Sequence, residues 1–413
     1  MRKICLTLVG IYILCMGAFA QQTKKDSVYA SRPLRLDEVN FVTGYYTQEG
    51  IHSPVTGGIG TEHVVDLSNG LDVKFVGWDT HNTKHTLGVD VGFDHHTSAS
   101  SAYVSKSGAS KTGGTRIYPS LDYTAENRRG NSIGFGTYFS TEYNYKSFGL
   151  DVHAGRKIGD GTTVNAKLSG YFDKVKLIYP SELIPQTVAT SPTTYTTASG
   201  NTVGNGGGYA GKIAIPSSPR NTYTLSLGAE QIINSRMQVS VMLDFVAQNG
   251  YLGLPFHRVY FNDGSAHVEN LPDIRKKLPI GVRLNYFAGD RVVIRTYYRY
   301  YVDDWGLKAH TAELEVPVKI TPFFSVAPFY RYYTQTAINY FAPYGAHTAA
   351  EQYYSSNYAL SALTSHYIGA GFHLAPPDGI LNKHFNALDV RLGHYTQSTA
   401  LYASSLTFAF TFK

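Results

Sequence analysis

Apolar and polar residues alternate along this sequence in stretches of roughly ten residues, and each stretch is followed by a break. In KHTLGVDVGF (residues 84–93), every second residue from Leu87 to Phe93 is apolar, and Asp90 lies on the opposite side. A period of two is typical of β-strands, whose successive side chains point to opposite faces. The pattern therefore predicts about sixteen strands. They are 37–46, 71–79, 84–95, 115–125, 131–141, 146–157, 162–174, 220–230, 236–248, 278–288, 290–302, 307–319, 322–333, 364–375, 385–395 and 402–412.

The two faces of these strands distinguish a membrane barrel from a soluble sandwich, which alternates as well. Strand after strand combines an unbroken apolar face with a face that carries full charges. A sandwich buries its apolar faces against each other and needs no systematic charge on long strands. The chain is also rich in Tyr, Phe and Gly, with 33, 21 and 40 residues, which favours strands and turns over helices.

The lengths of the connections follow a rule that points to the same fold. The even-numbered connections are short: 80–83, 126–130, 158–161, 231–235, 289, 320–321 and 376–384. Every long connection is odd-numbered: 47–70, 96–114, 175–219, 249–277 and 334–363. Outer-membrane barrels have short turns on one rim and long loops on the other. We therefore predict an all-β fold, a transmembrane antiparallel β-barrel of about 16 strands with short periplasmic turns and long extracellular loops.

The last strand carries an aromatic ladder of Phe408, Phe410 and Phe412, with Thr and Ala between the rings. We expect this ladder to face outer-membrane lipid, with aromatic rings at the membrane interface. The strand resembles the C-terminal signal by which the barrel assembly machinery recognises its substrates. Those signals usually end on the aromatic residue itself, whereas Lys413 follows here.

The first twenty residues have the pattern of an export signal. Arg2 and Lys3 precede an apolar stretch, and Ala18-Phe19-Ala20 is a small-x-small cleavage site. We expect a signal peptide at 1–20 that directs export through the Sec pathway, a periplasmic N-terminal segment at 21–36 and the barrel at 37–413.

Removal of this peptide would also remove both cysteines and would lower the net charge from +6 to +4, because Arg2 and Lys3 are lost. The mature chain would then have no disulfide and no thiol chemistry. Its mild positive charge gives no argument for a nucleic-acid partner.

Charged side chains on the polar faces are the candidates for a functional lumen. Such charges could set a field that sorts solutes by charge, or they could pair across strands and stiffen the wall. A turn centred on Gly289 would pair Arg283 with Arg295, and the next turn would bring Arg295 close to Glu313 or Glu315. The lumen-lining candidates are Asp90, Lys167, Asp244, Arg283, Arg295, Arg299, Glu313, Glu315, Asp389 and Arg391.

The sequence gives no pattern for catalysis, a cofactor or a metal. We find no Ser-His-Asp order, nucleotide fingerprint or zinc-ligand spacing above chance, and we expect no enzymatic activity. His95 and His96 are adjacent on a strand and point to opposite faces, so they cannot easily share one ion. The segment TGGIGTEH (56–63) is expected to be a folded-in loop that narrows the pore.

Several strand-end motifs resemble a known family over most of the mature sequence. They are VTGGIGTEHVVD (55–66), STEYNYKSFGLD (140–151), QNGYLGLPFHRVYFND (248–263), YYRYYVDDWGLKAHT (297–311) and PFYRYYTQTAINYFAP (328–343). As a set they resemble family 3570 of the domains of unknown function, uncharacterised outer-membrane barrels of Gram-negative bacteria. The resemblance implies the fold and an outer-membrane location. Genes of this family tend to lie near those of a flavin transferase, a thioredoxin-like protein and a small lipoprotein, which implies a link to flavin-dependent redox work.

Three classes of function are compatible with these observations. The first is a channel or sleeve for a small solute or an envelope redox partner. The second is a barrel scaffold whose outer loops bind a partner, such as a small lipoprotein or a flavin-carrying redox protein. The third, which we favour least, is a barrel-borne hydrolase.

Overall fold

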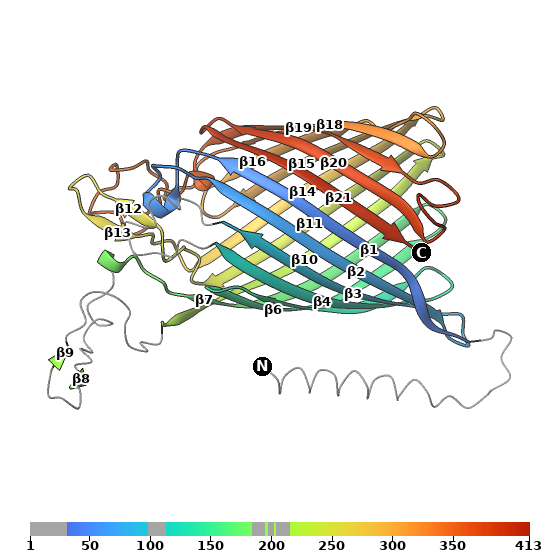
Figure 1. Ribbon diagram of the computed structural model, residues 1–413, viewed down its shortest axis with the longest axis horizontal. Helices are drawn as coiled ribbons and strands as arrows, with labels where there is room; N and C mark the ends of the chain where they lie inside the picture. Colours follow the sequence, from blue (N-terminus) through green and yellow to red (C-terminus); the bar gives the residue numbers. More distant parts are fainter. Residues whose placement is uncertain (1–30, 98–112, 184–194, 197–201, 204–214) are drawn as a thin grey trace.

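A computed structural model describes residues 31–97, 113–183, 195–196, 202–203 and 215–413, so the expected signal peptide at 1–20 and residues 21–30 lie outside the described part. The main sheet closes on itself, because β1 (Arg32–Glu49) pairs with both β2 (Val64–Trp78) and β21 (Leu401–Phe412) (Figure 1). All pairs between neighbouring strands are antiparallel. The other wall strands are β3 (Lys84–His96), β4 (Gly114–Glu126), β5 (Ser132–Thr141), β6 (Tyr145–Ile158), β7 (Thr162–Lys176), β10 (Ser217–Asn234), β11 (Met237–Gly250), β14 (Ile274–Ala288), β15 (Val292–Asp303), β16 (Lys308–Glu315), β17 (Val318–Lys319), β18 (Phe324–Gln335), β19 (Leu363–Leu374) and β20 (Phe385–Gln397).

The barrel has sixteen strands, because β16 and β17 are two parts of one strand. Both pair with β15 on one side and with β18 on the other, and Val316-Pro317 separates them. Proline cannot donate to a ladder, which accounts for the break. The predicted fold and strand number are confirmed. The first strand begins at Arg32, five residues before the predicted beginning at residue 37.

The outer surface of the barrel is apolar, as the alternation predicts. Leu150, Val152 and Leu168 leave about half of their surface exposed although they are large hydrophobic residues. A closed sheet with this surface satisfies its backbone hydrogen bonds internally and can be solvated by lipid. No helix within the described residues is long and apolar enough to cross a membrane.

The two ends of the barrel differ, as the connection lengths predict. The right-hand end in Figure 1 holds tight turns and the C-terminus, whereas folded loops gather at the left-hand end. Three loops, 50–63, 251–273 and 336–362, form what we call the cap. It contains η1 (Pro54–Thr56), β12 (Arg258–Tyr260), β13 (Ala266–Val268) and η3 (Tyr358–Leu360). The short elements η2 (Ser181–Leu183), β8 (Tyr195–Thr196) and β9 (Thr202–Val203) follow β7 in the chain.

The buried apolar core of the protein lies under the cap. Trp305, Leu307, Ala309 and Ile338 form a cluster in which each side chain is at most 5% exposed. Partly buried residues from the cap and from the strand ends pack against this cluster: Leu252, Leu271, Tyr301, Tyr333, Tyr340, Phe341 and Leu360. Barrel walls face lipid outside and water inside, so their buried hydrophobic residues, such as Val76 and Phe329, are scattered, whereas the cap buries a cluster of them.

Candidate functional site

One face of the closed sheet carries all the predicted lumen residues. Directly opposed residues on neighbouring strands point to the same face, so a series of such partners traces one side of the wall. Glu315 on β16 contacts Arg391 on β20 at 2.8 Å, although β18 and β19 lie between them. A contact over two intervening strands identifies the concave, inward side. The residues on that side include Asp90, Lys167, Asp244, Arg283, Arg295, Arg299, Glu313, Glu315, Asp389 and Arg391.

The predicted pairing of Arg283 with Arg295 is wrong. Arg283 lies opposite Tyr297, and Arg295 lies opposite Asn285. The alternation predicts a turn centred on Gly289 alone, whereas residues 289–291 all lie in the turn between Ala288 and Val292. The register moves by two residues, so both arginines stay on the inner face. The expected contact between Arg295 and Glu315 is present at 2.8 Å.

Cationic residues predominate on one part of the inner wall, from β14 to β20, which we call the basic arc. Arg295 and Arg391 share the carboxylate of Glu315, and Arg331 contacts Glu313 at 2.6 Å. The inward-facing carboxylates of this arc, Asp303, Glu313, Glu315 and Asp389, are fewer than its cations. The cations of the basic arc are Arg275, Lys277, Arg283, Arg295, Arg299, Lys319, Arg331 and Arg391.

Carboxylates predominate on another part of the inner wall, from β2 to β7, which we call the acidic arc. Lys167 contacts Asp151 at 3.1 Å and offsets part of this charge. The other cations of this arc are Lys74, Lys84, Arg116 and Lys157. The carboxylates are Asp66, Asp72, Asp90, Asp94, Asp122, Glu126, Asp151 and Asp173.

The two arcs lie on opposite sides of the barrel. In the order around the closed sheet, β3 is the third strand and β15 is the eleventh, which is half of the way around sixteen strands. Arg283, Arg299 and Lys167 point inward and are nevertheless exposed, so the lumen is open at their level. Opposed charges across a wet lumen create a transverse field that orients and sorts charged solutes.

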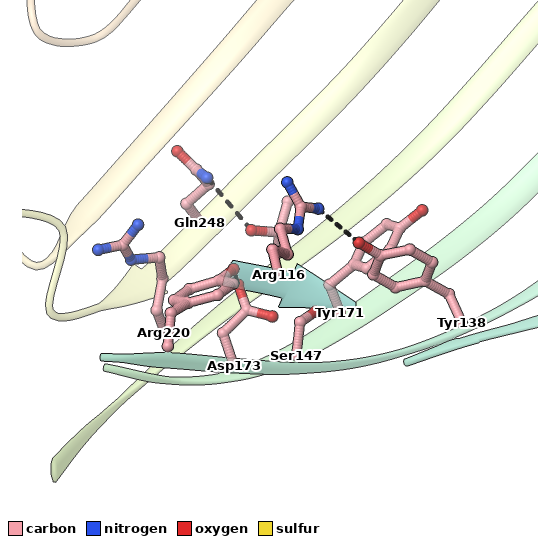
Figure 2. A pocket seen from close by; sticks show the side chains of 9 residues that line it. Arg116, Tyr138, Ser147, Tyr171, Asp173, Arg220 and Gln248 are labelled. Carbon is pink, nitrogen blue, oxygen red and sulfur yellow. Dashed lines mark hydrogen bonds between the residues drawn. The ribbon is translucent and has the colours of Figure 1, made fainter. Parts of the chain in front are cut away.

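A cavity of about 370 Å³ opens on the inner wall where β4 to β7 meet β10 and β11 (Figure 2). Arg116 donates a hydrogen bond to the hydroxyl of Tyr138 at 2.6 Å. Arg220 donates to the carbonyl oxygen of Tyr251 in the cap at 3.0 Å. Asp173 is only 5% exposed, and its Oδ1 has no hydrogen-bond partner within the described residues. Guanidinium, carboxylate and phenol groups here can contact a polar solute.

The cap covers part of the lumen at the loop end of the barrel. Ala309, Tyr301 and Tyr333 belong to the inner face, and they pack against cap residues such as Ile338. The loop 50–63 joins the cap, where the ring of His52 stacks on that of Tyr358 with centroids 3.7 Å apart. Burial raises the pKa of Glu62 in this loop to about 7.

The cap also contains a buried polar cluster, which does not form a catalytic triad. Ser355 donates to Glu269 at 2.6 Å, and His257 lies 3.7 Å from the same carboxylate. The carboxylate therefore stands between the hydroxyl and the imidazole, so within the described residues no imidazole contacts the serine hydroxyl as a triad requires. Burial would raise the pKa of Glu269, but hydrogen bonds and the charge of His257 lower it overall. A carboxylate held in this way stabilises the folded cap.

The aromatic ladder of the last strand lies on the face opposite to the lumen. Phe410 lies opposite Phe41 of β1 with ring centroids 6.0 Å apart, and Phe408 and Phe412 lie on the same side of the strand. Phe385 extends the ladder, because the centroid of its ring lies 5.2 Å from that of Phe412. The terminal rings thus cover the seam where the first and last strands close the barrel.

The sequence reasoning missed Arg116, Tyr138, Asp173 and Arg220, which line the cavity. They lie on four strands, β4, β5, β7 and β10, so no spacing along the chain brings them together. The only signal available was their position on the polar face near the loop end of each strand.

A closed antiparallel barrel with an apolar exterior and a charged, wet interior is a transmembrane β-barrel of the outer-membrane type. Residues 80–404 match the family described as "Protein of unknown function (DUF3570)", and the chain belongs to this family. No curated protein matches the sequence.

Three solved structures that resemble this chain are distant from it in sequence. Pseudomonas aeruginosa OccD3 (OpdP) is 8% identical, with a TM-score of 0.43 and 95% of each chain covered. A bacterial polysaccharide outer membrane secretin is 9% identical, with a TM-score of 0.44, and covers 91% of this chain and 98% of its own. A BenF-like porin from Pseudomonas fluorescens Pf-5 is 8% identical, with a TM-score of 0.42 and the same coverage. We draw no functional conclusion from likenesses at this level.

Proposed function

We propose that this protein is an outer-membrane channel for small charged or zwitterionic solutes. The observation that carries the proposal is the pair of opposed arcs on a lumen wall whose cations are exposed. A merely structural network would pair its charges locally. Within the described residues, Arg283 and Arg299 have no carboxylate partner, and Arg283 packs only over the ring of Tyr297 at 5.6 Å. Their fields therefore extend into the lumen.

The first test is the ion preference of the refolded mature chain in a planar lipid bilayer under a salt gradient. We expect discrete conductance steps. Arg283→Gln combined with Arg299→Gln should move the reversal potential toward cation preference, because the basic arc loses two unpaired charges. Asp72→Asn combined with Asp90→Asn should move it in the opposite direction.

A matched control for these variants is Lys319→Gln, which removes a cation at the turn end of the barrel, in β17. It should change the reversal potential much less than the double arginine variant does. Silence from a barrel that is demonstrably folded, or equal reversal potentials in all variants, would contradict the proposal.

A second candidate function is supported by the cap. Three loops far apart in sequence form one folded unit with buried apolar residues, whereas a simple pore needs only short or open loops. Such a unit could bind a partner, and we propose a small lipoprotein or a flavin-carrying redox protein as its class. Deletion of the gene should then lower the rate of flavin reduction at the cell surface, and an unchanged rate would contradict this alternative.

A further inference from the structure

Three potential metal ligands converge on the inner wall, away from the cavity of Figure 2. Asp122 lies on β4, and Asp151 and His153 lie on β6. One ligand atom from each lies within 4.8 Å of the other two. Nδ1 of His153 is 3.1 Å from Oδ1 of Asp151 and 3.8 Å from Oδ2 of Asp122. Ligand atoms around one tetrahedral ion have separations close to these, about 3.4 Å.

The intervening strand β5 is built to let these side chains meet. It places Gly134 and Gly136 between β4 and β6. A Cβ on Gly134 would lie 2.3 Å from Nε2 of His153, and one on Gly136 would lie 2.4 Å from Oδ2 of Asp151. The two β6 side chains therefore lie across β5, over space that any other residue would fill. An ion pair between neighbouring strands would need no such gap.

The other nitrogen of the imidazole has a suitable partner for a metal ligand. Nε2 of His153 lies 2.9 Å from the hydroxyl oxygen of Thr124. A histidine that binds a metal usually donates its second N–H to a nearby acceptor, which fixes the tautomer. With Nε2–H donated to Thr124, the lone pair of Nδ1 points toward the two carboxylates.

We propose that Asp122, Asp151 and His153 bind a divalent transition-metal ion of the Zn²⁺ class on the lumen wall. One imidazole nitrogen and two carboxylate oxygens are donors that Zn²⁺ accepts. Three protein ligands leave a coordination position for water. The Asp122 side chain is 48% exposed, so water and ions in the lumen can reach the site.

Lys167 sets the strength of this site. Its ammonium group lies 3.1 Å from Oδ2 of Asp151, whereas Oδ1 faces the imidazole. An ion bound through Oδ1 leaves the contact with Lys167 in place, but the two positive charges repel each other. Removal of the lysine charge should therefore tighten metal binding, which no accidental site elsewhere on the chain would do.

The test is calorimetric titration of Zn²⁺ into the refolded mature barrel, prepared without a histidine tag. We expect one site per chain. His153→Gln and Asp122→Asn should each weaken binding at least tenfold, and Lys167→Met should strengthen it severalfold. Glu126→Gln and His85→Gln are the matched controls, because they remove a carboxylate and an imidazole outside the cluster, and they should leave the affinity unchanged.

A second variant and a spectroscopic measurement distinguish loss of the metal site from misfolding of the barrel. Gly136→Ala should block the site while the heat-modifiable migration of a folded barrel is kept. Co²⁺ bound to the wild type should give visible absorption bands that disappear in His153→Gln. Equal Zn²⁺ affinity in the wild type and in folded His153→Gln, or no gain in Lys167→Met, would overturn the proposal.

Discussion

Glu315 shows how single residues organise the basic arc. Its carboxylate contacts Nη1 of both Arg295 and Arg391 at 2.8 Å, and its side chain is only 13% exposed. Arg391 reaches it from β20 by lying over the ring of Phe329, with its guanidinium carbon 3.9 Å from the centroid. The intervening strand β19 offers Gly371 at that level, opposite Arg391, and thereby leaves the path clear. One carboxylate thus holds two cations at the lumen surface.

Glu315→Gln should make the channel more selective for anions and should destabilise the barrel. The amide cannot neutralise two guanidinium groups, so both are left facing each other with an uncompensated charge. We expect a loss of about 1–3 kcal/mol in the free energy of unfolding, the usual cost of an unsatisfied charged partner. Reversal potentials and urea unfolding measure the two effects.

The control for this substitution is Glu313→Gln, two residues away on the same strand. Among the charged residues that the structure describes, Glu313 contacts only Arg331, whose side chain is 46% exposed. Glu313→Gln should therefore change the reversal potential and the free energy of unfolding less than Glu315→Gln does. Equal effects from the two variants would show that the shared position of Glu315 has no special role.

At the scale of strands and loops, the sequence predicts the wall well and the cap poorly. Alternation fixes which residues of a strand face inward, so all ten lumen candidates lie on the inner face even where the register was wrong. The pairing of Arg283 depended on how many residues a turn contains, and alternation carries no information about that. The contact between Asp122 and His153 depends on two glycines of a third strand, which no pattern within β4 or β6 reveals.

The stability of the loop 50–63 should depend on pH, because burial raises the pKa of the Glu62 carboxyl group in this loop. The pKa of Glu62 is about 7 in the folded state, against 4.5 for an unperturbed carboxyl group. The folded loop therefore binds more protons than the unfolded loop between pH 4.5 and pH 7. By linkage, the stability of the folded loop falls as the pH rises through this window. The change should be about 1–2 kcal/mol, because the group is only partly buried and solvent screens it.

Glu62→Gln should remove this pH dependence. Hydrogen exchange of loop amides measures it, for example that of Gly58, whose N–H donates to the carbonyl oxygen of Ser53 at 2.9 Å. After correction for intrinsic exchange, protection in the wild type should fall between pH 5 and pH 8, whereas protection in Glu62→Gln should stay constant. Asp263→Asn, an exposed carboxylate of the cap, should behave like the wild type. A fall in Glu62→Gln as large as that in the wild type would contradict the assignment.

The whole molecule combines two units that are stabilised differently. The barrel is a closed ladder in which every wall strand pairs with a neighbour on each side. The cap is connected through side-chain packing and isolated bridges, such as the one between Asn270 and Tyr354. Units with fewer cooperative contacts open at lower free energy than the rest of a protein. The cap can therefore unfold while the barrel stays closed, which would change the width of the lumen mouth.

The two tryptophans make this separation measurable. Trp305 is 3% exposed under the cap, and Trp78 lies at the turn end of β2 with the guanidinium of Arg32 3.8 Å above its ring. In Trp78→Phe the remaining fluorescence reports on the cap, and in Trp305→Phe it reports on the barrel. With increasing urea, the Trp305 signal should change at a lower concentration than the Trp78 signal does. Coincident midpoints would instead show that cap and barrel unfold as one cooperative unit, and would exclude the cap as an independently opening gate.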